Sequence, residues 1–107
     1  MRFDDVALAV STALRDHNFE AIETEFGSVL IQPDIKDPGQ IPLRVVYNPR
    51  TSMLEHPGRH VSPETLEFYE KYNGGRIYDL DLPQLMLKFV NEWLDKRKAD
   101  SQPFRHQ

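Results

Sequence analysis

Two histidines, His56 and His60, have the most suggestive spacing in this 107-residue chain. On a helix, a separation of four residues would direct both imidazole rings to one metal ion. Pro57 and Gly58 between them are typical of a loop, and Glu55 is the only further ligand type beside them in the sequence. We therefore interpret both histidines as exposed loop side chains, with a metal site as the alternative, and predict no cofactor.

Four arginines would form an anion-binding patch if folding brings them together: Arg44, Arg50, Arg59 and Arg76. Arg59 also precedes the predicted start of a helix at Pro63, and helix N-termini attract anions. The competing interpretation is that these arginines balance surface carboxylates in weak ion pairs. The region 44–60 together with Arg76 is thus the candidate site for a small ligand.

A group of aromatic side chains forms the third candidate, because tyrosine is enriched at protein interfaces. The candidate interface residues are Phe68, Tyr69, Tyr72 and Tyr78. On the predicted helix after Pro63, Phe68 lies off the line formed by Leu66, Tyr69 and Tyr72. An off-line aromatic residue forms either a second buried face or an exposed contact.

Composition excludes several function classes. The chain has no cysteine, which removes disulfides, thiolate zinc sites and cysteine nucleophiles. A net charge of −4 disfavours a phosphate backbone as partner, so we predict no nucleic acid. No apolar run approaches the roughly 18–20 residues of a membrane span, so we predict no membrane association and a cytoplasmic location.

The first half of the chain predicts one helix and a set of strands. Apolar residues at steps of three and four favour a helix over residues 3–16, closed by Asn18 in the left-handed conformation. Residues 19–33 favour a β-hairpin with a two-residue turn at Gly27-Ser28. In its first strand, every second residue is expected to face inward: Ile22, Thr24 and Phe26.

The next segment, residues 41–47, alternates in the same way. Its apolar positions are expected to share the buried face: Ile41, Leu43, Val45 and Tyr47. Arg44 and Val46 then point the other way. A short fourth strand is expected at residues 52–55.

The second half predicts two helices. Ser62 and Pro63 form a strong N-terminal signal, and Asn73-Gly74-Gly75 supplies the end of that helix. Residues 77–80 form a possible short strand returning to the sheet. The last helix follows Asp81 and has a continuous apolar stripe: Leu82, Leu85, Met86, Phe89, Val90, Trp93 and Leu94.

Residues 62–75, which read Ser-Pro-Glu-Thr-Leu-Glu-Phe-Tyr-Glu-Lys-Tyr-Asn-Gly-Gly, resemble the helix and Asn-Gly-Gly end of the SMI1/KNR4-like immunity superfamily. Serine replaces the leucine that usually precedes the proline in that family. The sheet of that family mostly follows this motif, and the chain after residue 75 is too short to supply it. We interpret the segment as a capped helix and assign no family.

The predicted fold is α+β, an antiparallel meander of three to four strands with the N-terminal and C-terminal helices packed on it. The predicted order is α-β-β-β-(β)-α-(β)-α, in one domain over residues 1–98 with a flexible tail at residues 99–107. With no catalytic motif, we expect a non-enzymatic protein-binding accessory of the adaptor, chaperone-like or immunity and inhibitor type, and a homodimer. The alternative is a small-ligand or metal-binding protein, or an enzyme, that uses region 44–60 and Arg76.

Overall fold

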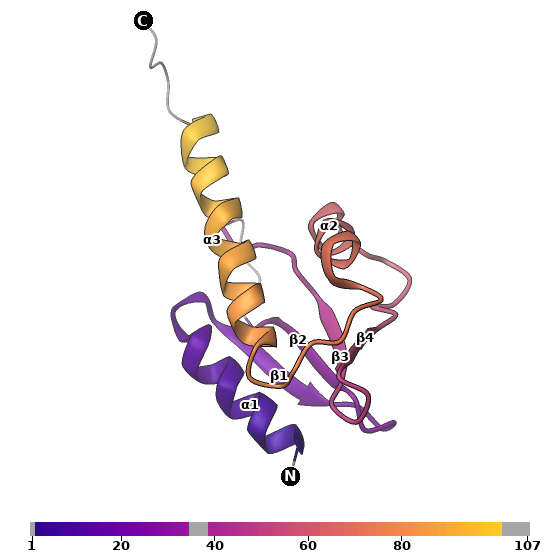
Figure 1. Ribbon diagram of the computed structural model, residues 1–107. Coiled ribbons are helices and arrows are strands. Elements are labelled where there is room, and N and C mark those ends of the chain that lie inside the picture. The colour runs from indigo at the N-terminus through magenta and orange to yellow at the C-terminus, as the bar shows by residue number, and fades with distance from the viewer. Residues whose placement is uncertain (1, 35–38, 102–107) are drawn as a thin grey trace, which may run out of the picture.

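The computed structural model describes residues 2–34 and 39–101, and within them the predicted α+β fold is confirmed (Figure 1). Three α-helices and four strands follow one another with one short 3-10 turn. In chain order they are α1 (Arg2–Ala13), η1 (Arg15–His17), β1 (Phe19–Glu23), β2 (Val29–Pro33), β3 (Val45–Asn48), β4 (Met53–Glu55), α2 (Pro63–Tyr72) and α3 (Leu82–Ser101). The strands form one antiparallel sheet in the order β1-β2-β3-β4.

One face of the sheet forms one side of the hydrophobic core. Helices α1 and α3 both lie on this side of the sheet (Figure 1). Cross-strand neighbours on this face have no measurable exposure: Val29, Ile31, Val45 and Tyr47. Val6 and Val10 of α1, and Leu14 directly after it, are buried and cover this side of the core. Asn18 closes this region with φ 58° and ψ 44°, the predicted left-handed conformation.

The apolar stripe of α3 is buried as predicted. Leu82, Met86, Phe89 and Val90 belong to the core, and Leu85, Trp93 and Leu94 pack partly against it. The helix continues to Ser101 and so includes residues 99–101 of the predicted tail. The remainder of that predicted tail, residues 102–107, lies outside the described residues.

Within residues 41–47 the side chains lie on the predicted faces of the sheet, but strand pairing starts later than predicted. Ile41, Leu43, Val45 and Tyr47 are all buried, whereas Arg44 is exposed and Val46 is half-buried. The ladder begins only at Val45 because helix α2, and not a strand, covers the edge of the preceding residues.

Side chains of α2 bond to the backbone along this edge. The hydroxyl of Thr65 accepts from the Arg44 N–H at 3.0 Å, and the hydroxyl of Tyr69 accepts from the Val46 N–H at 3.0 Å. Tyr69 also donates to the Glu55 carbonyl at 2.6 Å. The two hydroxyls are four residues apart on one face of the helix, so they match alternate N–H groups of an extended chain.

The predicted inward set of the first strand is wrong. Ile22 is 41% exposed and Phe26 is 76% exposed, while Phe19 is buried. The turn is not the predicted pair Gly27-Ser28: the Gly27 N–H bonds to the Thr24 carbonyl, and Gly27 has φ 82°. This longer turn sets the register, and a shift of one residue in register moves every side chain to the opposite face.

Two expectations about the segment after β4 also change. Phe68 is fully buried and packs edge-on against Phe89 of α3 at 5.4 Å between ring centroids, while Leu66 is 52% exposed. The inward line of α2 therefore runs through Thr65 and Phe68. Ile77 is buried without forming the possible strand at residues 77–80, although its N–H donates to the Ser52 carbonyl at 2.7 Å.

Candidate functional site

The histidine pair does not assemble into a metal centre. His56 and His60 are both exposed, and the Nδ1 atom of His56 accepts a hydrogen bond from the Gly58 N–H at 3.0 Å. Within residues 2–34 and 39–101, no group of three histidine or carboxylate side chains is placed to hold a metal ion. The loop conformation inferred from Pro57 and Gly58 explains the observed arrangement.

The structure divides the four candidate arginines among separate locations. The guanidinium of Arg44 lies beside Gly58, and that of Arg50 donates to the Phe26 carbonyl at 3.0 Å. Arg50 and Arg76 line one surface hollow of about 590 Å³. It is lined by Arg50, Thr51, Ser52, Arg76, Tyr78, Asp79, Leu80 and Asp81. Since two carboxylates line the same hollow, the arginine charge there is largely balanced.

The four candidate aromatics do not form one surface either. Phe68 and Tyr69 are core residues, Tyr72 is half-buried, and Tyr78 is 62% exposed. The hydroxyl of Tyr69 is already hydrogen-bonded to the backbone of Val46 and Glu55 at the strand edge. Burial raises the pKa of Tyr69 to about 12, so this hydroxyl stays protonated at neutral pH.

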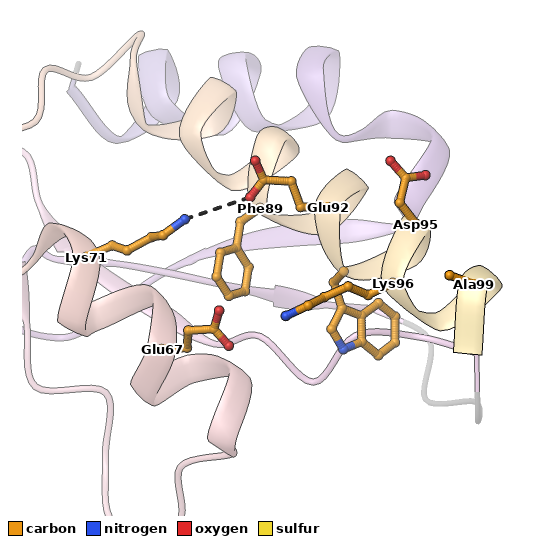
Figure 2. Close-up of a pocket in the computed structure, with 8 residues that line it drawn as sticks. Glu67, Lys71, Phe89, Glu92, Asp95, Lys96 and Ala99 are labelled. Atoms are coloured by element: carbon orange, nitrogen blue, oxygen red, sulfur yellow. Dashed lines mark ion pairs between the residues drawn. The ribbon is translucent and has the colours of Figure 1, made fainter. Parts of the chain in front are cut away.

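A groove of about 520 Å³ runs between α2 and α3 (Figure 2). Its lining combines an aromatic floor with a charged rim: Glu67, Lys71, Phe89, Glu92, Trp93, Asp95, Lys96 and Ala99. Figure 2 shows the phenyl ring of Phe89 facing the space between the two helices. The residue types are those of a peptide groove.

Several polar groups of this groove have partners within the protein. Lys71 of α2 lies 3.8 Å from Glu92 and 5.9 Å from the Phe89 ring centroid, both on α3. The indole N–H of Trp93 donates to Glu64 of α2 at 3.2 Å, while the Arg97 guanidinium lies 4.8 Å from the Trp93 ring centroid within α3. Because the Lys71 and Glu64 contacts join α2 to α3, we interpret the groove as a packing seam between the helices.

A network of polar side chains joins β2, β3 and β4. Ser28 and Asn48, both buried, donate to the two carboxylate oxygens of Glu55. These two hydrogen bonds, with a smaller contribution from the Arg50 charge, lower the pKa of Glu55 below its usual value. The network holds an ionised carboxylate at the end of the shortest strand. The lowered pKa makes the Glu55 carboxylate a weak base toward the Ser28 hydroxyl, so we interpret the network as structural.

The second face of the sheet has no helix over its central strands, and we call it the open face. Its side chains come from the residues that alternate along each strand with those of the core face. Strand pairing places Ile22 beside Leu30, Leu30 beside Val46, and Val46 beside Glu55. These three aliphatic side chains form one row across three strands, and all are half-buried or exposed.

A polar row lies next to this apolar row on the open face. Glu20 pairs with Gln32, whose amide donates to the Glu20 carboxylate at 3.1 Å. The β2–β3 pairing ends at Ile31 and Val45, so Arg44, exposed just before β3, would lie beside Gln32 if the same register continued by one residue. Its guanidinium lies beside Gly58, in the loop after β4. A carboxylate on β1 and a guanidinium just before β3 thus flank the open face. Neither forms an ion pair with another described residue.

Sequence reasoning missed this surface because it placed Ile22 inside. One signal was present: Arg44 and Val46 were expected to point away from the core, and they do. With the observed turn, the same alternation of side chains along the strand places Glu20 and Ile22 on the open face. Among the described residues, no helix combines the length and hydropathy that a membrane span requires.

Comparisons with protein-family models, with curated proteins and with solved structures give no match for this chain. The residues of the chain itself are therefore the basis of the functional proposal.

Proposed function

We propose that this protein is a non-enzymatic protein-binding accessory domain of the adaptor, chaperone-like or immunity and inhibitor type. Its binding surface in this proposal is the open face of the sheet. The observation that carries the proposal is the aliphatic row Ile22, Leu30 and Val46, which no helix covers. Antiparallel sheets that face water on one side usually place polar residues there.

The arrangement of the open face suits protein recognition. Removing an aliphatic row from water provides affinity, while the adjacent polar row provides register and specificity. Small-molecule sites are usually concave pockets, whereas an aliphatic row on a sheet face favours a macromolecular partner.

The placement of the reactive side chains supports a non-enzymatic role. The two histidines lie in a loop beside Arg44, whereas Arg50 and Arg76 line a different hollow with two aspartates. Groups that act in one reaction must lie within hydrogen-bond reach of a common substrate. The alternative role in small-ligand or metal binding has no specific contact in its favour.

Site-specific photo-crosslinking tests the proposal in cells that express the full chain. A photoreactive residue replaces Ile22 on the open face, and a matched control replaces Leu66, which is exposed on α2. We expect position 22 to form covalent adducts of defined mass with identifiable proteins, and position 66 to form few. A Leu30→Arg substitution beside position 22 is expected to abolish those adducts.

The design also shows how the proposal fails. Circular dichroism confirms that each variant keeps its fold. Equal adduct yields at positions 22 and 66, or adducts that persist with Leu30→Arg, would show that the open face is not the binding surface.

A further inference from the structure

We infer that the open face binds a second copy of this chain, with two sheets packed face to face about a two-fold axis parallel to β2. The inference rests on the proposed function and specifies its partner. It comes from the symmetry of the open face about β2, the strand that lies between β1 and β3. An interface across a two-fold axis uses the same surface of both copies and must be complementary to itself.

The apolar row meets this requirement. Rotation by 180° about an axis along β2 places β1 of one copy over β3 of the other and keeps each row in line. Leu30 then faces Leu30 of the second copy on the axis. Ile22 faces Val46 on one side of it, and Val46 faces Ile22 on the other. The three aliphatic positions of one copy are thereby covered by the same three of its partner.

The polar row supplies the charge complementarity that favours a second copy over an unrelated partner. The same rotation places Glu20 opposite Arg44 and Arg44 opposite Glu20, with the two Gln32 side chains between them. The dimer gains two opposite-charge pairs from residues that form no ion pair with another residue in the described part of the chain. A two-fold axis perpendicular to the strands and level with Glu20 would instead bring Glu20 against Glu20.

The geometry of packed sheets accommodates these contacts. Sheets in a sandwich lie about 10 Å apart with nearly aligned strands, a gap that glutamate and arginine side chains span together. Helices α1 and α3 cover the opposite side of each sheet and so stay outside the interface (Figure 1). The face is only four short strands wide, so we expect a reversible dimer with a dissociation constant on the order of micromolar.

Sedimentation analysis of the purified full chain over a concentration series tests the charge pairs. Glu20→Arg and Arg44→Glu each bring two like-charge pairs into the dimer, and each is expected to weaken it by at least about tenfold. The double variant E20R/R44E exchanges the two charges and is expected to restore the affinity to within about threefold of the original chain. Glu70→Arg and Lys88→Glu, exposed charge reversals on α2 and α3, are matched controls expected to leave the dimer unchanged.

A crosslinking measurement covers the case in which a charge variant does not fold. The chain has no cysteine, so Leu30→Cys introduces a single thiol on the two-fold axis. A short bis-maleimide is expected to link two such chains and to leave the Leu66→Cys control unlinked.

A chain that remains monomeric at all concentrations would overturn the inference, as would single charge variants without effect or a double variant that fails to restore association. Adducts at position 22 with a different protein, together with a monomeric chain, would refute self-association alone and leave the proposed function standing. If the chain is monomeric and position 22 forms no adducts, both the self-association and the proposed function are refuted.

Discussion

The two faces of this sheet are built from the same four strands, yet they have opposite surroundings. Ile31 on the core face has no measurable exposure, while its neighbour Leu30 is half-buried on the open face. Both are aliphatic, so residue type does not explain the difference. What differs is that α1 and α3 lie on one side only (Figure 1). An aliphatic residue on an uncovered face contributes less to folding and remains available for association.

The largest difference between the two faces is expected in the free energy of unfolding when Ile31 and Leu30 are each replaced by alanine. Ile31→Ala is expected to lower the free energy of unfolding by about 2–5 kcal/mol, because it opens a cavity in a packed core. Leu30→Ala is expected to cost roughly 1 kcal/mol or less, because its site is already in partial contact with water. Urea unfolding of both variants, at a concentration where the chain is monomeric, measures the difference. Equal losses would mean that the open face is covered within one chain.

An intermediate effect is expected where α2 seals the strand edge. Tyr69→Phe removes the hydroxyl that joins the Val46 N–H and the Glu55 carbonyl, leaving both without that partner. The expected loss is about 1–3 kcal/mol, measured by urea unfolding. Leu66→Ala on the exposed side of α2 is the matched control and is expected to change stability by less than about 0.5 kcal/mol.

Alkaline titration adds an independent measure of the same hydroxyl. The pKa of Tyr69 is raised to about 12 in the folded protein, above the ordinary tyrosine pKa of 10.0. Its stabilising contribution is therefore complete below pH 10 and is lost as pH rises toward 12. Tyr69→Phe should remove this part of the alkaline loss, and an unchanged alkaline profile would contradict the assigned role.

The smallest effect concerns the carboxylate of Glu55 at the margin of the open face. Its pKa is lowered in the folded protein, first by the Ser28 hydrogen bond and then by Asn48. Its contribution is present above the unfolded pKa and declines as pH falls through the lower folded value. Glu55→Gln should flatten the stability profile on the acid side of the ordinary glutamate pKa of 4.5. Glu67→Gln, on the exposed side of α2, should leave that profile unchanged.

Much of the architecture follows from local patterns. The stripe through Leu82, Met86 and Phe89 predicted α3, and Ser62 predicted the start of α2, where its hydroxyl accepts from the Thr65 N–H at 3.0 Å. The alternation at residues 41–47 assigned each side chain to the correct face. The candidate site was less accessible to prediction, because the residues chosen for their chemistry lie in different places once the chain is folded.

The sequence by itself determined the elements and the inward side of those with uninterrupted periodicity, because period and capping depend on neighbouring residues. Only the tertiary structure decided which side of β1 faces the core, since the turn at Gly27 sets the register of the hairpin. It also decided that the hydroxyls of α2 replace a strand beside Arg44 and Val46. The row of Glu20, Gln32 and Arg44 arises in the same way. Three residues far apart in the chain become neighbours only through strand pairing, which no local pattern encodes.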